Sequence, residues 1–332
     1  MRRDVKSWAA ATAGWSAVSA VAGLMWATGG PGFPFGGSDR AARMGAVLTG
    51  LDPAPGGAAV FVLGLGGMVV ASLMPSRPRL RFVCWPAAAV LLLVVPDGRL
   101  LLAVGELLMW HGDRVEAAAV GQAWCTAGGV LWAGAALAAG RGKGRAADPG
   151  WARPITLVAA ALPLVYAAPR ALWAAGFPFG LDPAATAMVS TPGGRTRELV
   201  FATAAVSGGL LTLGLTQRWG TRLPAWVPLL RDRPVPGRLA VVPAAAVAVV
   251  LTGAGFTMWR ALAAAAFTGP TGEAAFDLAN WAAWAGNLIW LPWGTTLGLA
   301  AWAYHRRDGA KKSLHSATLR RTIDCVDRGY ER

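Results

Sequence analysis

Gly-Phe-Pro-Phe-Gly stands at residues 32–36 and again at 176–180, each time shortly after a long apolar run. A second pair of identical segments, Pro-Ala-Ala-Ala-Val, follows in the same order at 86–90 and 243–247. Internal repeats reveal the architecture of a chain before local patterns do. Two landmarks repeated in one order predict a chain built from two related halves.

The composition places both halves in a membrane. Hydrophobic residues make up 55% of the chain, charged residues only 14%, and the mean hydropathy is +0.45. A soluble domain carries about a quarter charged residues. Here the charges cluster between apolar stretches of roughly 20 residues, the length that spans a hydrocarbon core. A net charge of +14 would suggest nucleic acid in a soluble protein. In this chain, membrane topology explains the charge, and no nucleic-acid partner is expected.

The apolar runs predict an all-α polytopic protein with about eight transmembrane helices. The first run exceeds the apolar region of a signal peptide, so we expect a retained first helix. The third run contains Pro96-Asp97-Gly98-Arg99, a turn signal. Residues 82–110 therefore form either one kinked span or a broken, re-entrant pair. The predicted spans are 7–28, 58–75, 82–110, 117–139, 155–175, 199–217, 239–262 and 277–304.

The positions of Lys and Arg predict the orientation. Basic residues concentrate at the N-terminus and in alternate connecting segments, which eight spans place on one side of the membrane. Since cytoplasmic segments carry the excess of Lys and Arg, both termini are expected in the cytoplasm of a cell-membrane protein. Four spans per half give a parallel 4+4 repeat. The predicted units are a first four-helix repeat (1–140), a basic cytoplasmic linker (141–154), a second repeat (155–304) and a basic cytoplasmic tail (305–332).

Ionisable residues inside the predicted spans are the first candidates for a functional site, because charges within a membrane are costly. Asp97 and Arg99 lie in the third span, Arg170 in the fifth and Arg260 in the seventh. Opposite charges at matched depth would line an outward-facing polar cavity that binds a ligand. The alternative is structural pairing, or arginines that reach the interface by snorkelling.

The eighth predicted span carries a polar and aromatic stripe. Asn280, Trp284 and Asn287 recur at near-helical spacing and are further ligand-binding candidates, for an apolar ligand or a lipid headgroup. The alternative is packing within the helix bundle through interhelical hydrogen bonds.

No motif in the sequence predicts a metal, a cofactor or a reaction. The three cysteines have no paired spacing and the three histidines follow no metal-binding pattern. There is no phosphate-binding loop and no nucleophile elbow. The basic tail, with Arg320 and Arg321, is predicted to lie against anionic lipids of the inner leaflet. Protein partners are left open.

Several short segments resemble one family. They are Trp-Ala-Thr-Gly-Gly at 26–30, the two Gly-Phe-Pro-Phe-Gly loops, Arg-Trp-Gly at 218–220 and Leu-Pro-Ala-Trp-Val-Pro at 223–228. Together they are similar to a group of uncharacterised multi-pass membrane proteins of high-GC Gram-positive (actinobacterial) bacteria. The resemblance covers most of residues 15–305. It implies a fold and a membrane location, and no activity.

Three functional classes follow. The first is a protein that binds or moves a small or lipid-like ligand through the polar cavity. The second, less favoured, is a membrane enzyme on a lipid or isoprenoid, with Asp97 or Glu106 as general acid. The third is a non-catalytic membrane scaffold. Asp97→Asn separates them, since it would abolish turnover, alter ligand binding, or leave a scaffold intact.

Overall fold

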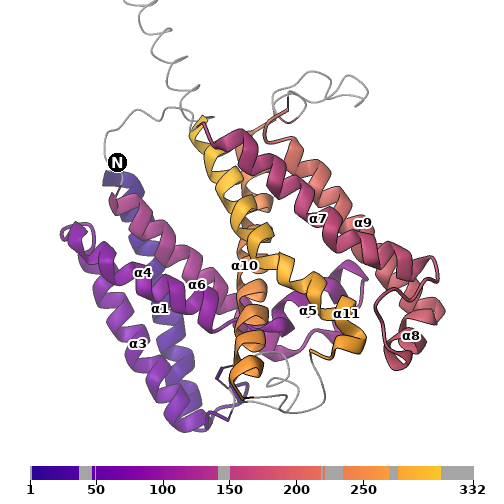
Figure 1. Cartoon of the computed structure of the whole chain (residues 1–332). Helices are drawn as coiled ribbons and strands as arrows, with labels where there is room; N and C mark the ends of the chain where they lie inside the picture. The colour runs from indigo at the N-terminus through magenta and orange to yellow at the C-terminus, as the bar shows by residue number, and fades with distance from the viewer. Residues whose placement is uncertain are drawn as a thin grey trace, which may run out of the picture.

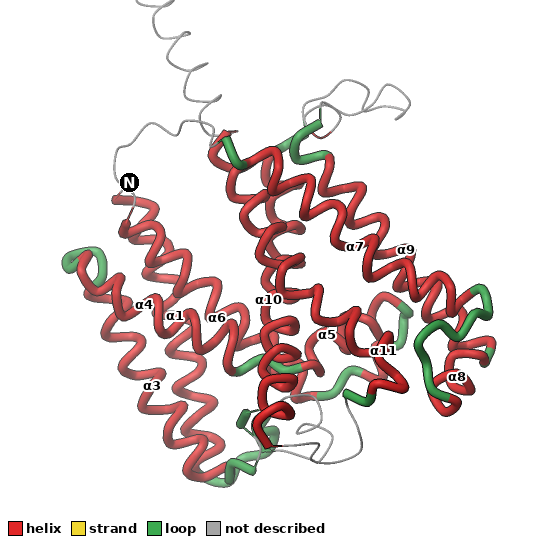
Figure 2. Tube along the Cα trace, viewed as in Figure 1, coloured by secondary structure: helices red, strands yellow, loops and turns green. Residues whose placement is uncertain are grey.

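The computed structural model describes residues 2–36, 47–48, 50–140, 150–217, 220, 235–268 and 276–307. Within these residues the chain consists of helices and the loops between them, without strands (Figures 1 and 2). This is the expected result for apolar segments in lipid, where a helix satisfies every backbone hydrogen bond within the segment. The predicted tail contacts of Arg320 and Arg321 lie outside the described residues.

The first half contains two long helices, a broken helix and a further long helix. They are α1 (Arg2–Ala27), α3 (Pro53–Leu73), the pair α4 (Arg81–Ala89) and α5 (Gly98–Leu108), and α6 (Ala117–Gly140). The second half runs in a similar order, with its last segment divided. It comprises α7 (Ala152–Ala174), α8 (Pro183–Ser190), α9 (Pro192–Leu213), α10 (Gly237–Thr268), α11 (Trp281–Ala285) and a helix over 290–307.

Five helices of the described chain are long and apolar enough to cross a membrane, and a sixth crossing is counted if the bent pair α4 and α5 is one span. These six correspond to the first, second, third, fourth, fifth and seventh predicted spans. The predicted sixth and eighth spans fall on α9 and on 290–307, which are helical. α9 carries three charged residues near its start, Arg195, Arg197 and Glu198. The eight-span topology therefore stays a prediction.

The helix ends are sorted by side (Figure 1). At the upper end of the molecule in this view lie the first residues of three helices, α1, α7 and α10. The last residues of α6, α9 and the helix over 290–307 lie at the same end. The sequence places its basic segments next to these ends. The connections that adjoin these helix ends therefore all start or finish on the same side of the molecule.

Small residues let the helices of each half pack closely. α1 packs against α3, and a Cβ placed on Gly57 would lie 2.4 Å from the backbone nitrogen of Ala27. In the second half, α7 packs against α9, where a Cβ on Gly209 would lie 2.8 Å from the carbonyl oxygen of Ala160. Close approach through glycine is a common way for helices to associate in membranes. The first two long helices pair in the same way in both halves.

Both Gly-Phe-Pro-Phe-Gly loops fold back onto their own half. Phe33 and Phe35 pack edge-on against Trp26, at ring-centroid distances of 5.6 and 6.5 Å. In the second loop, Phe179 packs edge-on against Trp281 at 5.4 Å. The first loop is thus anchored on the helix that precedes it, and the second on α11 of the same half.

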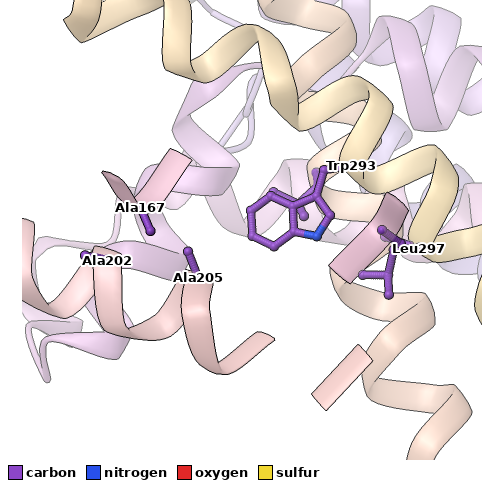
Figure 3. Packing of buried hydrophobic residues seen from close by; sticks show 8 residues of the cluster. Ala167, Ala202, Ala205, Trp293 and Leu297 are labelled. Carbon is purple, nitrogen blue, oxygen red and sulfur yellow. The ribbon is translucent and has the colours of Figure 1, made fainter. Parts of the chain in front are cut away.

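The buried core of the second half surrounds one tryptophan (Figure 3). Trp293 extends from the helix over 290–307 toward small residues of α7 and α9, among them Ala167, Ala202 and Ala205. In the first half, Trp132 of α6 is likewise buried against alanines. A large aromatic side chain fills the volume that small residues leave between helices.

Candidate functional site

The candidate site begins with a break in the middle of an apolar segment. The segment that contains α4 ends in one π-helical turn, Val90–Val94, and α5 departs from it at an angle of 62°. The amide of Val95 donates to Val90 (3.0 Å), five residues back. Pro96 follows and has no amide hydrogen. A π turn and a proline are established causes of sharp helix bends.

An ion pair occupies the break. Asp97 is the N-cap of α5, and its Oδ1 accepts the backbone amide of Arg99 at 2.9 Å. The Arg99 guanidinium donates to both carboxylate oxygens, with Nη2 2.7 Å from Oδ2. Only 1% of the Asp97 side chain is exposed. Paired hydrogen bonds between charged groups are strong, and this pair neutralises both charges inside the protein.

Side chains of α6 and α10 satisfy the backbone polar groups that the bend frees. Gln122 of α6 accepts the amide of Asp97 through Oε1 at 3.2 Å. Thr257 of α10 donates its hydroxyl to the carbonyl oxygen of Pro96 at 2.9 Å. Both side chains are buried. Buried backbone groups nearly always find such partners, because an unpaired one is costly in an apolar interior.

Arg260 completes this cluster from α10. Its Nη1 donates to the carbonyl oxygens of Leu93 and Val94, at 3.3 and 3.5 Å. The Asp97 carboxylate also attracts the Arg260 guanidinium electrostatically. The structure therefore brings three of the four predicted charged residues, Asp97, Arg99 and Arg260, to one place between the halves.

The fourth predicted residue, Arg170, belongs to a second cluster. On α7 its guanidinium forms a short ion pair with Glu198 of α9, and Arg197 binds the other oxygen of the same carboxylate at 3.1 Å. Glu198 is 3% exposed. It was missed from the sequence because it lies one residue before the predicted span 199–217. A carboxylate directly after two arginines, Arg195 and Arg197, at the start of an apolar run is the signal that would have found it.

Aromatic rings enclose the Arg170 guanidinium. It lies 4.3 Å from the ring centroid of Tyr166 and 5.5 Å from that of Phe201. Cation–π contacts of this kind stabilise a desolvated guanidinium. Arg170 is thus held by a carboxylate and rings of its own half, and not by Asp97.

Glu106 lies apart from both clusters, at the end of α5. Its carboxylate is 3.4 Å from Nδ1 of His111 and 3.9 Å from Arg114, and 33% of its side chain is exposed. This weak pairing at an exposed helix end differs from the enclosed pair at Asp97.

The predicted polar stripe lies on an irregular segment. A 3₁₀ turn precedes α11 and another, Gly286–Ile289, follows it, so Asn280, Trp284 and Asn287 do not share one regular helix. Trp284 donates to the carbonyl of Asp277 at 3.0 Å, and Asn287 donates to that of Ala283 at 3.2 Å. Both of these bonds stay within the segment.

No protein-family model matches this chain, and comparisons with curated proteins and with solved structures find no similar protein. The family resemblance of the short segments therefore stays a prediction. Within the described residues, no group of three or more His, Cys, Asp or Glu side chains is arranged to hold a metal ion.

Proposed function

We propose that this chain is a multi-pass cell-membrane protein that binds or moves a small or lipid-like ligand at the broken helix between its two halves. The proposed topology has eight spans in a parallel 4+4 repeat, with both termini in the cytoplasm. The sorted helix ends of Figure 1 support this topology, because they put the ends that adjoin the basic segments on one side.

One observation carries the functional proposal. The only bent helix pair found among the described residues is also where Asp97, Arg99 and Arg260 gather. Irregular backbone at membrane depth is tolerated where it is buried in protein or lines a cavity. In secondary transporters, discontinuous helices at a repeat interface form the substrate and ion sites. Charged side chains within a membrane are costly, which makes those at this bend candidates for function.

The site is closed in this structure. Asp97, Gln122 and Thr257 are each buried; the Asp97 carboxylate binds Arg99, and Gln122 and Thr257 bind the broken backbone. Ligand binding therefore requires a change that admits water from one side. This requirement makes the proposal testable without knowing the ligand.

The test is the accessibility of a cysteine at the break. In a background with Cys84, Cys125 and Cys325 replaced by alanine, Thr257→Cys is exposed in intact cells to a membrane-impermeant, charged methanethiosulfonate. We expect labelling within minutes, because the site opens to the outside. Ala205→Cys is the matched control, since Ala205 is 4% exposed in the apolar core and Thr257 is 3% exposed at the break.

Two results would refute the proposal. If neither cysteine reacts in intact cells or in inside-out vesicles, the break is a closed structural clamp and the protein is better described as a scaffold. If both react equally, the reagent reports general loosening of the helices. Labelling of Thr257→Cys only in inside-out vesicles would keep the site and reverse its direction of opening.

A membrane enzyme is the alternative, and one observation favours it. Asp97 is enclosed and holds Arg99 with both oxygens, so a substrate has no access to it here. Glu106 is 33% exposed and faces His111 across 3.4 Å, an arrangement that suits a general acid, although the two facing atoms are buried here. This alternative gains support if Thr257→Cys stays unlabelled.

A further inference from the structure

Three consecutive carbonyl groups at the break have lost their helical donors. In a regular α-helix the amides of residues 95, 96 and 97 would donate to the carbonyls of residues 91, 92 and 93. Here the amide of Val95 donates to Val90, Pro96 has no amide hydrogen, and the amide of Asp97 donates to Gln122. The bend therefore presents a row of carbonyl oxygens next to the Asp97 carboxylate.

A positively charged side chain, Arg260, binds at the end of this row. The Arg260 guanidinium donates to the carbonyl of Leu93, the last of the row, at 3.3 Å, and to that of the next residue, Val94, at 3.5 Å. The Arg99 guanidinium instead donates to both oxygens of the Asp97 carboxylate. The carbonyls and the carboxylate accept hydrogen bonds, and they are the groups with which membrane proteins replace the hydration shell of a cation.

We infer that the bend at residues 91–97 is a site for a small monovalent cation, with Arg260 as the tethered cation that fills it in the closed state. In the open state of the proposed transport site, a soluble cation takes the place of the guanidinium. The replacement of Arg260 by a soluble cation rests on the proposed function, whereas the cation site itself does not. The backbone carbonyls remove the need for a second carboxylate, because their dipoles supply the negative potential.

The position of α10 supports a seat for a compact ion. A Cβ placed on Gly253 would lie 2.9 Å from the carbonyl oxygen of Leu92. The glycine thus brings α10 against the middle of the row, and Arg260 on the same helix binds its last carbonyl, that of Leu93. A site confined in this way favours a small ion over a bulky organic one.

The experiment removes the tethered cation and supplies a free one. Arg260→Ala protein in nanodiscs is heated with guanidinium chloride, sodium chloride or choline chloride at equal concentrations of about 10 mM, well below the molar range in which guanidinium denatures proteins. We expect guanidinium to raise the Tm of the variant by about 2 °C or more and to leave the parent unchanged, because only the variant has a vacant seat. Choline is the ionic-strength control.

The comparison of the three salts also identifies the kind of cation that binds. Stabilisation by guanidinium alone indicates an organic cation, and stabilisation by sodium as well indicates an inorganic one. Arg306→Ala is the matched control, because its guanidinium lies 4.7 Å above the Trp302 ring and bonds no carbonyl in the described contacts. It should show no difference among the three salts.

Equal Tm values for Arg260→Ala in all three salts would overturn the inference, as would equal stabilisation by all three. If Arg260→Ala does not yield folded protein, Arg260→Gln carries the same test, since it keeps an amide donor and loses the charge. The two proposals fail separately. A cation effect with an unreactive Thr257→Cys would leave the cation site standing and remove the transport function.

Discussion

The ion pair at the helix break gives the sharpest quantitative prediction. Asp97→Asn keeps an N-cap side chain for α5, since asparagine caps helices as well as aspartate does. It removes the charge and leaves the Arg99 guanidinium, which is 10% exposed, without a carboxylate. Arg99→Gln leaves the opposite defect. Because the pair is buried, each single change should lower the free energy of unfolding by about 3–5 kcal/mol.

The double variant Asp97→Asn, Arg99→Gln should be far less damaged than the sum of the two. Much of each single loss comes from the charge that stays behind, and the double variant leaves neither. We therefore expect a coupling free energy of at least about 2 kcal/mol, well above the roughly 0.5 kcal/mol within which independent sites add. Asp97→Ala should cost about 1 kcal/mol more than Asp97→Asn, because the cap is also lost.

The assay is equilibrium unfolding in mixed micelles with increasing SDS, followed by tryptophan fluorescence. Glu106 and Arg114 provide the control cycle, since their charges lie 3.9 Å apart and are 33% and 60% exposed. Exposed pairs are worth about 0.2–1 kcal/mol, so this cycle should show little coupling. Additive effects at Asp97 and Arg99, or equal coupling in both cycles, would contradict the enclosed ion pair that the structure shows.

Two further predictions concern packing and sidedness. Gly57→Ala should lower the free energy of unfolding by about 1–3 kcal/mol, because the added methyl group would overlap the backbone of Ala27. Gly66→Ala is the control, since no atom lies within 4 Å of its added Cβ. It should be neutral or slightly stabilising in the same SDS titration. In a cysteine-free background, an impermeant maleimide should label Ser190→Cys in intact cells and Ser76→Cys only after permeabilisation; the reverse pattern would invert the proposed orientation.

The sequence predicted the helices and the break for clear physical reasons. Apolar runs of membrane-spanning length have few alternatives to helix. The break follows from Pro96, which removes one amide, and from Asp97, which is a strong N-cap for the helix that restarts at Gly98. Sequence reasoning left open a kinked span or a broken pair, and the structure shows a broken helix with an angle of 62°.

The grouping of the charged residues could not be predicted in the same way. Counting residues along a span gives the depth of a side chain but not the direction in which its helix is rotated. Arg170 and Asp97 were matched by depth, yet Arg170 turns toward Glu198 of α9. The pairing depends on how α7 and α9 pack, which is set by contacts such as that of Gly209 with Ala160. Such contacts are tertiary and have no signature in local spacing.

The repeated Pro-Ala-Ala-Ala-Val segments relate the broken helix to α10. Pro96 follows the first segment at the same distance along the chain as Gly253 follows the second. The two equivalent residues are neighbours in space, with a Cβ on Gly253 3.7 Å from Cβ of Pro96. Equivalent positions meet near the axis of a two-fold repeat, so this contact supports the proposal that the two halves are related.

The chemical difference between those two residues makes the halves complementary. Proline breaks the first helix and frees its carbonyls, whereas glycine keeps its amide and lets α10 continue as a helix. The unbroken helix can therefore present Thr257 and Arg260 to the broken one at fixed positions. One half supplies the acceptors and the other supplies the donors. The cluster thus depends on the proline that breaks one helix and on the side chains that the unbroken helix holds in place.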